Sequence, residues 1–362
     1  MKRSRLSLPL RLFIILISVT LLLCGAVLCV WLRGRSALRN KPPVAPKLTE
    51  QSSFAEADAS APEEKPDALL DSHTVLRDGK YYRYKDGLIN LLLIGVDSDV
   101  KPGSPLPYGG DHQADVIILA ALDTDANTMT LISVSRDTVC PIEIPAADGS
   151  ASSVANAQLA LSYSYGDGLG VSCKLCRDAV SNLFHGLQID GYAAFYMGGV
   201  AGLNDALGGV SVTILDDYPF SGLEGCENML PGSEVTLTGE QAQKYIRLRH
   251  LDETGNSGRM ERQKQYLLAM ISQTRSRLAS NPAWALSLYS ALSRYLLTDL
   301  DLSRISYLAT EVAQMGFSGD ILGVEGESVL GAGDHMELTV DEAALYDLIL
   351  NVFYEEFVPN GG

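Results

Sequence analysis

The stretch Leu88–Asp97, LINLLLIGVD, is a run of apolar residues that ends in Gly-Val-Asp. A short apolar run of this kind is typical of a fully buried strand, and the aspartate after it predicts a functional loop at the strand's end. Two similar runs follow, DVIILAALD over residues 115–123 and TMTLISVSR over residues 128–136. The TDAN between them has the composition of a tight turn, so the two runs predict an antiparallel hairpin.

Segments of helical and strand period alternate irregularly after this hairpin, and the sequence has no internal repeat. The expected helices are 172–186, 198–207, 239–248, 258–279, 283–297, 302–315 and 341–356, and the expected strands are 191–197, 209–215 and 320–329. Thr238 and Gln241 form the pattern of a capping box at the start of one helix. The order of elements predicts a single α/β domain, in which helices cover both faces of a central sheet.

The N-terminal segment Leu12–Leu32 carries no charge, and a membrane-spanning helix needs about 20 apolar residues. A cleaved signal peptide is the alternative, but its apolar core is usually about 7–15 residues long and ends at a small-residue cleavage site. We therefore expect an uncleaved transmembrane anchor over residues 12–32, after a short cytoplasmic tail over residues 1–11. Basic residues are equally frequent on both sides, so the expected orientation rests on the large body lying outside.

The region that follows the anchor is rich in Pro, Ala, Ser and Glu and shows no apolar period. Such a composition cannot bury enough apolar surface to fold. We expect a disordered tether over residues 33–80 and a folded extracytoplasmic domain over residues 81–358. The chain would thus be a single-pass membrane protein with its C-terminal domain outside the cytoplasm.

The chain has a formal net charge of −16, although its first 41 residues contain only basic charges. The rest is therefore strongly acidic, which excludes a nucleic-acid-binding surface, because such a surface needs clustered positive charge. Four cysteines follow the apolar segment, and they would allow three disulfide pairings in an oxidising compartment. These are Cys140, Cys173, Cys176 and Cys226. Structural or free thiols are the favoured interpretation, since the C-x-x-C pair has no partner motif for zinc.

Acidic residues gather at the expected strand ends. Asp97 and Asp99 follow the first strand, and Asp115 begins the second. Mg²⁺ is typically held by one or two carboxylates together with phosphate oxygens and water, so Asp97 and Asp115 are candidate ligands of Mg²⁺ or Mn²⁺. Aspartates that only cap turns are the alternative.

Arginines form the second candidate group. Arg136 and Asp137 end the third apolar run, where the guanidinium either pairs internally with Asp137 or points toward the same crevice as Asp97 and Asp115. Four more arginines lie in YIRLRHLDETGNSGRMERQ, residues 245–263, across the end of one expected helix and the start of the next. They are Arg247, Arg249, Arg259 and Arg262, followed by Gln263. Guanidinium groups at a helix start suit phosphate oxygens, whereas a solvated charged surface is the alternative.

Seven motifs, in order and behind one apolar N-terminal segment, resemble the LytR-CpsA-Psr family of bacterial cell-wall proteins. They are NLLLIGVD, ADVIILAALD, LISVSRDT, ANAQLALSYSYG, GYAAFYMGGVAGLNDALGGVSVTI, LTGEQAQKYIRLRH and GRMERQ, and the resemblance covers roughly residues 88–356. The resemblance implies a central twisted mixed sheet between helices, with an apolar cleft for a lipid. It also implies a phosphotransferase that moves a glycopolymer from a polyprenyl-pyrophosphate carrier to a peptidoglycan hydroxyl.

The resemblance also implies roles for individual residues. Asp97 and Asp115 would hold Mg²⁺ against the pyrophosphate, and Asp137 would orient Arg136. The pyrophosphate oxygens would be contacted by Arg136, Arg247, Arg249, Arg259, Arg262 and Gln263. Arg136, Asp97 and Asp115 would thus form the catalytic group.

Two positions depart from the family pattern. Asp99 stands where the family often has an arginine, and Gln113 and Ala114 replace an Arg-Ser/Thr pair before Asp115. The entrance to the site thereby loses positive charge. Two alternatives to the transferase therefore stay open: a pyrophosphate hydrolase, and a membrane-tethered protein that binds polyprenyl pyrophosphate without turnover.

Overall fold

The computed structural model describes residues 25–48, 73–99, 101, 103, 105–106, 112–146, 152–215, 218–248, 255–331 and 335–358. The strands are β1 (Thr74–Arg77), β2 (Lys80–Tyr84), β3 (Leu88–Val96), β4 (Ala114–Asp123), β5 (Thr128–Val134), β6 (Val139–Pro145), β7 (Ser152–Gln158), β8 (Gly191–Tyr196), β9 (Val210–Thr213), β10 (Glu234–Leu237), β11 (Leu296–Thr298), β12 (Gly316–Gly323), β13 (Gly326–Leu330), β14 (Met336–Val340) and β15 (Tyr354–Phe357). The helices are α2 (Leu159–Ser164), α3 (Gly170–Leu183), α4 (Val200–Leu207), α5 (Gly239–Arg247), α6 (Gly255–Ser280), α7 (Trp284–Leu292), α8 (Leu302–Gln314) and α9 (Glu342–Phe353), with short 3₁₀ turns η1 (Met197–Gly199) and η2 (Phe220–Gly222).

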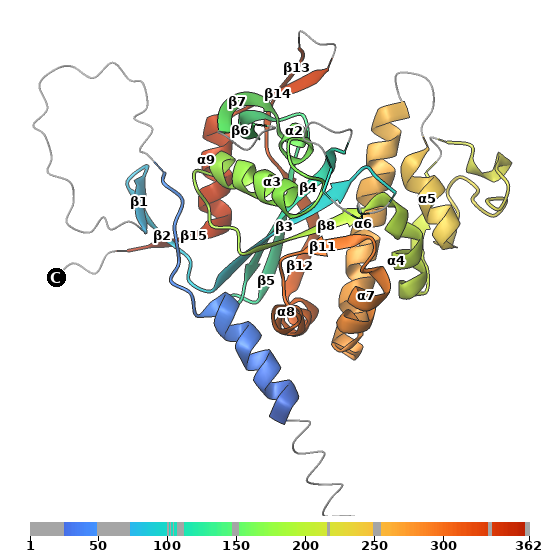
Figure 1. The fold of residues 1–362 in the computed structure, drawn as a ribbon, viewed down its shortest axis with the longest axis horizontal. Helices are drawn as coiled ribbons and strands as arrows, with labels where there is room; N and C mark the ends of the chain where they lie inside the picture. Colours follow the sequence, from blue (N-terminus) through green and yellow to red (C-terminus); the bar gives the residue numbers. More distant parts are fainter. Residues whose placement is uncertain are drawn as a thin grey trace, which may run out of the picture.

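A six-stranded sheet in the order β11-β8-β3-β4-β5-β12 forms the centre of the molecule (Figure 1). β3 pairs in parallel with β8, and β5 with β12, whereas β4 runs antiparallel to both β3 and β5. The sheet is therefore mixed, as expected. The predicted hairpin is also present, since β4 and β5 pair from Ile117↔Val134 to Asp123↔Thr128 around the predicted turn.

Alternate residues of the central strands bury into two separate cores. Leu92 and Ile94 of β3 pack with α3 and α9 on one face, while Ile89 and Leu91 pack with α8 on the other. Because both faces are covered, the strands read as nearly continuous apolar runs. The prediction of helices on both faces of the sheet is confirmed.

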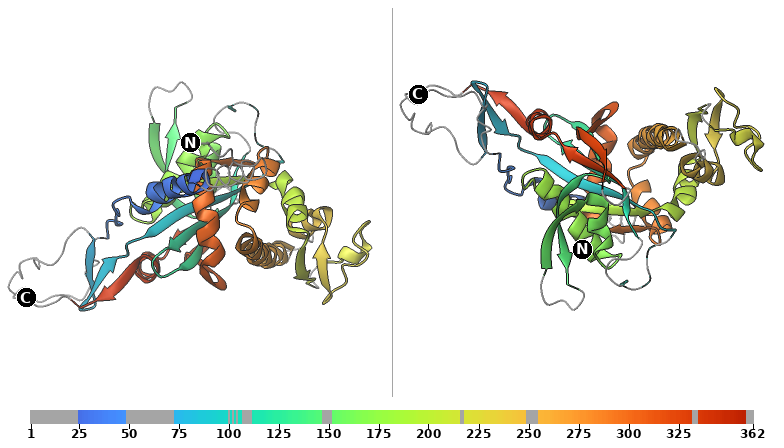
Figure 2. Two further views of the ribbon diagram at one scale, coloured as in Figure 1. Left: turned by 90° about the horizontal axis from the view of Figure 1, so that it is seen from below. Right: turned by 90° about the horizontal axis from the view of Figure 1, so that it is seen from above.

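A third core lies beyond one edge of the sheet, where α4, α5 and α6 surround the short β9–β10 hairpin. Figure 2 shows this group at the end of the molecule opposite β1, β2 and β15. The α5 helix begins at the capping box predicted from sequence: Gln241 N donates to Thr238 Oγ1, and Thr238 N donates to Gln241 Oε1.

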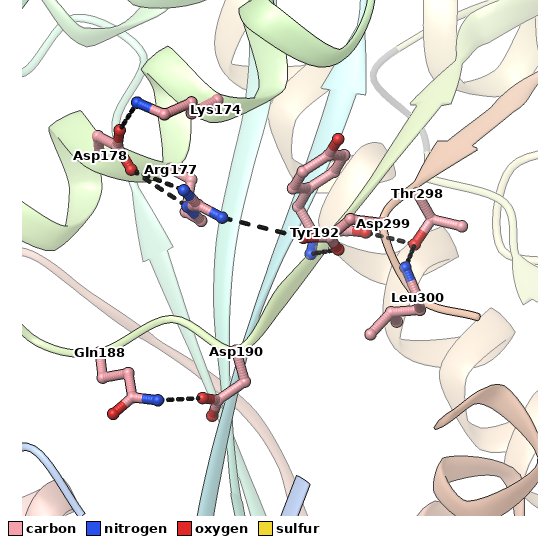
Figure 3. Close-up of polar contacts among 9 residues, drawn as sticks. All are labelled: Lys174, Arg177, Asp178, Gln188, Asp190, Tyr192, Thr298, Asp299 and Leu300. Atoms are coloured by element: carbon pink, nitrogen blue, oxygen red, sulfur yellow. Dashed lines mark hydrogen bonds and ion pairs between the residues drawn. The ribbon is translucent and has the colours of Figure 1, made fainter. Parts of the chain in front are cut away.

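Polar contacts fasten α3 to the β8–β11 edge of the sheet (Figure 3). Arg177 lies between Asp178, at 3.1 Å, and Asp299, at 3.9 Å. Asp299 in turn accepts a hydrogen bond from Tyr192 N, and Thr298 Oγ1 donates to Tyr192 O. These carboxylates already face protein donors, so this cluster holds the fold together rather than forming a second site.

The N-terminal part of the described chain is built into the fold. Residues 25–39 are helical, and Trp31 Nε1 donates to Thr310 Oγ1 of α8 at 2.8 Å. The Trp31 ring also meets the Tyr307 ring edge-on, with centroids 5.5 Å apart. Leu38 is 2% exposed and belongs to the core on the α8 face of the sheet.

The residues after this helix continue along the domain. Lys47 N donates to His185 O at 2.7 Å, and Pro46 O accepts from Tyr354 Oη at 3.4 Å. The prediction of a disordered tether is therefore wrong for residues 33–48, and also for residues 73–80, which enter β1 and β2. The composition of this region suggested a linker, but its few large side chains find places in the core of the domain. The remainder of the expected tether, residues 49–72, lies outside the described residues.

The expected anchor is only partly described. Residues 12–24 lie outside the described residues, and residues 25–32 form the beginning of the packed helix. Within the described ranges, none of the helices combines the length and the apolar character that crossing a membrane requires.

Candidate functional site

The first two predicted site residues meet because β3 and β4 are antiparallel. Asp97 follows the end of β3, and Asp115 lies at the start of β4. The pairing skips Asp115, since Gly95 pairs with Val116 and Val96 pairs with Ala114. Asp115 is thus the extra residue of a β-bulge, a device that redirects a side chain at the end of a ladder.

Arg136 reaches this bulge from the end of β5. Its two Nη atoms donate to Asp115 Oδ1 and to Gln113 Oε1, and its Nε lies 3.6 Å from Asp137 Oδ1. Asp137 is itself held in place, because Gln158 Nε2 donates to its Oδ1 at 3.3 Å. Both alternatives that the sequence left open for Arg136 therefore hold: the guanidinium is paired internally, and it lies beside Asp115.

The charges around Asp115 show which predicted residues come together. Burial raises the pKa of Asp115 most strongly, and Asp97 and Asp137 raise it further, whereas Arg136 and Arg259 lower it. The net effect is a pKa above the ordinary value. The structure thus gathers Asp97, Arg136, Asp137 and Arg259 around the half-buried Asp115.

Arg247 and Arg259 border the site from the third core. Arg247 ends α5 and is exposed, and its Nη2 lies 3.1 Å from Oδ1 of Asp99 in the loop after β3. Arg259 is half-buried in the first part of α6. Arg249, between the two helices, lies outside the described residues.

The prediction that Arg262 contacts an external anion is wrong. Arg262 is 0% exposed, and its guanidinium donates to the carbonyl oxygens of Tyr245, at 2.7 Å, and Leu248. The Phe220 ring centroid lies 5.2 Å from its Cζ. Burial lowers the pKa of Arg262 to about 10. The residue instead closes the C-terminal end of α5, whose last carbonyls need donors.

Gln263 has a similar structural contact. Its Nε2 donates to Ile246 O at 3.0 Å, so its donor group binds the α5 backbone instead of facing the Asp115 cluster. Sequence reasoning also missed a member of the site. Gln113 was noted only as a departure from a pattern, yet it supports Arg136 directly. Its position two residues before Asp115 was the available signal.

The donor set fits a divalent cation that is shared with a phosphate ligand. Two carboxylates, Asp97 and Asp115, interact there, and Arg136 does not compensate the burial of Asp115, because the pKa of Asp115 remains raised. A bound cation would stabilise the buried negative charge of Asp115. Among the described residues, no three His, Cys, Asp or Glu side chains are grouped as a complete metal cage. Mg²⁺ does not need one when substrate phosphates complete its coordination.

A polar cavity of about 250 Å³ lies at the opposite end of β3 and contains none of the predicted site residues. Its lining includes Arg39, Lys41 and Lys85. Each of these cations is close to an acid: Arg39 to Asp125, Lys41 to Asp190 and Lys85 to Asp123. The cavity therefore offers an anion no unpaired positive charge from these residues, and the Asp115 cluster stays the candidate site.

The four cysteines do not form a disulfide in this structure. Cys140, Cys173, Cys176 and Cys226 are free and buried. Cys140 on β6 and Cys176 on α3 belong to the same core cluster. The interpretation as structural or free thiols is confirmed.

Comparison with known proteins gives one family and several relatives. The sequence profile of the LytR-CpsA-Psr family (LytR_cpsA_psr) matches residues 48–335. The polyisoprenyl-teichoic acid–peptidoglycan teichoic acid transferase TagU of Oceanobacillus iheyensis is 29% identical over 235 residues, covering 64% of this chain and 65% of that protein. The cell wall biosynthesis protein LcpA of Corynebacterium glutamicum is 28% identical over 282 residues, covering 70% and 53%. The chain thus spans about half to two thirds of these relatives.

The fold also has counterparts among solved structures. The crystal structure of B. subtilis TagV superposes with a TM-score of 0.53 at 23% identity, covering 73% of this chain and 95% of that chain. The likeness is one of fold. In this chain the central mixed sheet places the Asp115 cluster where β3 and β5 end and β4 begins.

Proposed function

Because the chain belongs to the LytR-CpsA-Psr family, we propose that it is a membrane-anchored phosphotransferase of the cell envelope. Its substrate is a glycopolymer on a polyprenyl-pyrophosphate carrier, and its acceptor is a hydroxyl group of peptidoglycan. Two observations support the proposal: relatives are named teichoic acid–peptidoglycan transferases, and Arg136 and Arg259 lie beside two carboxylates at the edge of the sheet. The arrangement of the arginines and carboxylates carries the argument, because it places groups that bind an anion next to a carboxylate that can accept a proton.

The reaction transfers one phosphoryl-linked sugar chain. The acceptor oxygen attacks the phosphorus that carries the sugar, a new O–P bond forms, and the bond from this phosphorus to the bridging oxygen breaks. Polyprenyl phosphate leaves with that oxygen. Such a transition state requires positioning and neutralisation of negative charge more than covalent catalysis.

Arg136 is prepared for this role by its neighbours. Its guanidinium is fixed between Asp115 and Gln113, so little side-chain freedom remains to be lost when an anion binds. Arg259 and Arg247 extend the positive border toward the third core. These groups orient the pyrophosphate and stabilise the charge that develops on its oxygens.

Asp115 is the better candidate for the base that accepts the hydroxyl proton. Asp115 is half-buried beside Arg136, where it would meet a hydroxyl group that approaches the pyrophosphate. Asp97, by contrast, is exposed. Asp97 and Asp115 would hold Mg²⁺ or Mn²⁺, which supplies positive charge to the pyrophosphate oxygens when it is bound.

The membrane anchor remains part of the proposal and rests on the sequence of residues 12–32. An anchor there would keep the domain close to a lipid-linked substrate. We place the domain on the outer side of the membrane, where peptidoglycan is found.

To test the proposal, the purified full-length chain in lipid nanodiscs is incubated with peptidoglycan oligomers and a polyprenyl-pyrophosphate sugar that carries a label in the sugar. The wild type should attach label to the oligomers. Arg136→Gln and Asp115→Asn should each lower the rate by about a hundredfold or more, as losses of transition-state contacts do, without a lower melting temperature. Glu356→Gln, at an exposed ion pair with Lys80 on the far side of the molecule, serves as the control.

The location of the label separates the alternatives. Transfer by both variants at the wild-type rate would contradict the assigned site. Free labelled sugar phosphate without any attached label would identify a hydrolase. Intact lipid bound by the wild type, without product, would identify a binding protein.

A further inference from the structure

The exposed ion pair between Asp99 and Arg247 lies at the border of the candidate site. Arg247 Nη2 is 3.1 Å from Asp99 Oδ1, and the two side chains are 41% and 77% exposed. Arg247 ends α5, while Asp99 lies in the loop that begins with Asp97. The pair thus joins the loop that carries a proposed metal ligand to an arginine that we place on the pyrophosphate.

The backbone at Asp99 passes close to η1. A Cβ atom at Gly198 would lie only 1.9 Å from the Asp99 carbonyl oxygen, so only glycine permits this approach. The contact arises because β3 and β8 are parallel, with Val96 beside Tyr196, and their following loops meet. Asp99 therefore extends toward Arg247 from a position beside η1.

The site is rich in carboxylates even though its ligand would be an anion. Its described residues include the arginines Arg136, Arg247 and Arg259, and the aspartates Asp97, Asp99, Asp115 and Asp137. An anion that takes the Nη2 donor now facing Asp99 displaces the Asp99 carboxylate. It must also approach that negative charge, which opposes binding.

We propose that Asp99 is a positioning residue that competes with the pyrophosphate for Arg247. Asp99 pairs with the guanidinium when the site is empty. The ion pair breaks when the ligand binds Arg247, and it forms again when the polyprenyl phosphate product leaves. The carboxylate thereby keeps affinity for prenyl phosphates low and favours product release. This inference rests on the proposed function, because it assumes that the site binds a pyrophosphate.

Calorimetric titration of the full-length chain with farnesyl diphosphate, with and without Mg²⁺, tests the competition. Asp99→Asn removes the charge but keeps the size of the side chain, and it should lower the Kd about three- to tenfold, as expected for an exposed pair plus a like charge. Glu356→Gln makes the same charge change at an ion pair of similar length, 2.9 Å, and should leave the Kd unchanged. A purely structural role of Asp99 would not tighten binding.

A double-mutant cycle identifies Arg247 as the group in competition. In the Arg247→Gln background, Asp99→Asn should change the Kd by less than about twofold. An equal tightening in both backgrounds, or no tightening in the wild-type background, would overturn the inference.

The Arg136→Gln variant separates the inference from the proposed function. If Arg136→Gln abolishes binding while Asp99→Asn has no effect, the pyrophosphate site of the proposed function stands and the inference fails. If neither the wild type nor any variant binds the diphosphate, both fail.

Discussion

At the scale of single residues, Arg262 and Arg247 show how differently two arginines of one segment are used. Arg247 is exposed, whereas Arg262 is enclosed by carbonyl oxygens of α5 and by aromatic rings. Removing a buried donor of this kind leaves desolvated acceptors without partners, which costs several kcal/mol.

We predict that Arg262→Met lowers the free energy of unfolding by about 3 kcal/mol. Arg247→Met should change it by less than about 0.5 kcal/mol, since exposed ion pairs such as the one between Arg247 and Asp99 contribute little to stability. Chemical unfolding followed by circular dichroism measures both. Equal stability of the two variants would mean that Arg262 does not stabilise the junction between α5 and α6.

The sequence predicted the helix that carries these residues but not which of them is buried. Helical spacing placed Arg259, Arg262 and Gln263 at the start of one helix, and α6 is indeed there. Which of them turns inward depends on Phe220, far earlier in the chain, and on the end of α5. The proximity of Asp97, Asp115 and Arg136 was easier to predict, because each residue lies at one end of a strand with a clear apolar pattern. The bulge that redirects Asp115 has no signature in the sequence.

At the scale of elements, α3 and β6 meet through buried thiols. Burial raises the pKa of Cys140 to about 11 and that of Cys176 to about 12. An unfolded thiol ionises near its ordinary pKa of about 8.5–9. Above that pH the unfolded state loses protons that the folded state keeps, so stability falls as pH rises.

We therefore predict that these two thiols remove about 2–3 kcal/mol from the unfolding free energy between pH 8 and pH 10. A Cys140→Ala/Cys176→Ala variant should be less stable at pH 8, because it leaves cavities, yet should lose less stability up to pH 10. Denaturant titrations at both pH values give the two slopes. Parallel slopes would show that the thiols do not contribute.

The elements that the sequence predicted are those with strong local signals. The runs of β3, β4 and β5 and the capping box of α5 are examples, and their bounds differ from the prediction by only a few residues. The β6–β7 hairpin was missed because β7 reads SSVANAQ, which is small, polar and largely exposed. Its strands are formed by pairing with each other and not by an apolar period.

At the scale of the whole molecule, residues 25–48 act as part of the domain. Leu38 enters the core beneath the sheet, and Trp31 packs on α8. The loss of a large buried apolar side chain typically costs 2–5 kcal/mol. Composition alone assigned this region to a linker, because a few anchoring side chains in a polar segment produce no periodic pattern.

A chain that begins at residue 49 should consequently melt roughly 5–10 °C below one that begins at residue 25. Leu38→Ala in the longer chain should reproduce part of the difference. Differential scanning calorimetry of the three proteins measures it. Identical melting temperatures would show that residues 25–48 add nothing to the stability of the domain.

The packing of residues 33–48 also sets how far the folded domain could move from an upstream anchor. Fully extended, this segment could span about 50 Å and let the domain sample a thick layer of the cell wall. Bound along α8 and the strands beside it, the segment provides no such reach. An anchor upstream would hold the domain at one height above the bilayer, so under the proposed function the peptidoglycan acceptor would have to approach the domain.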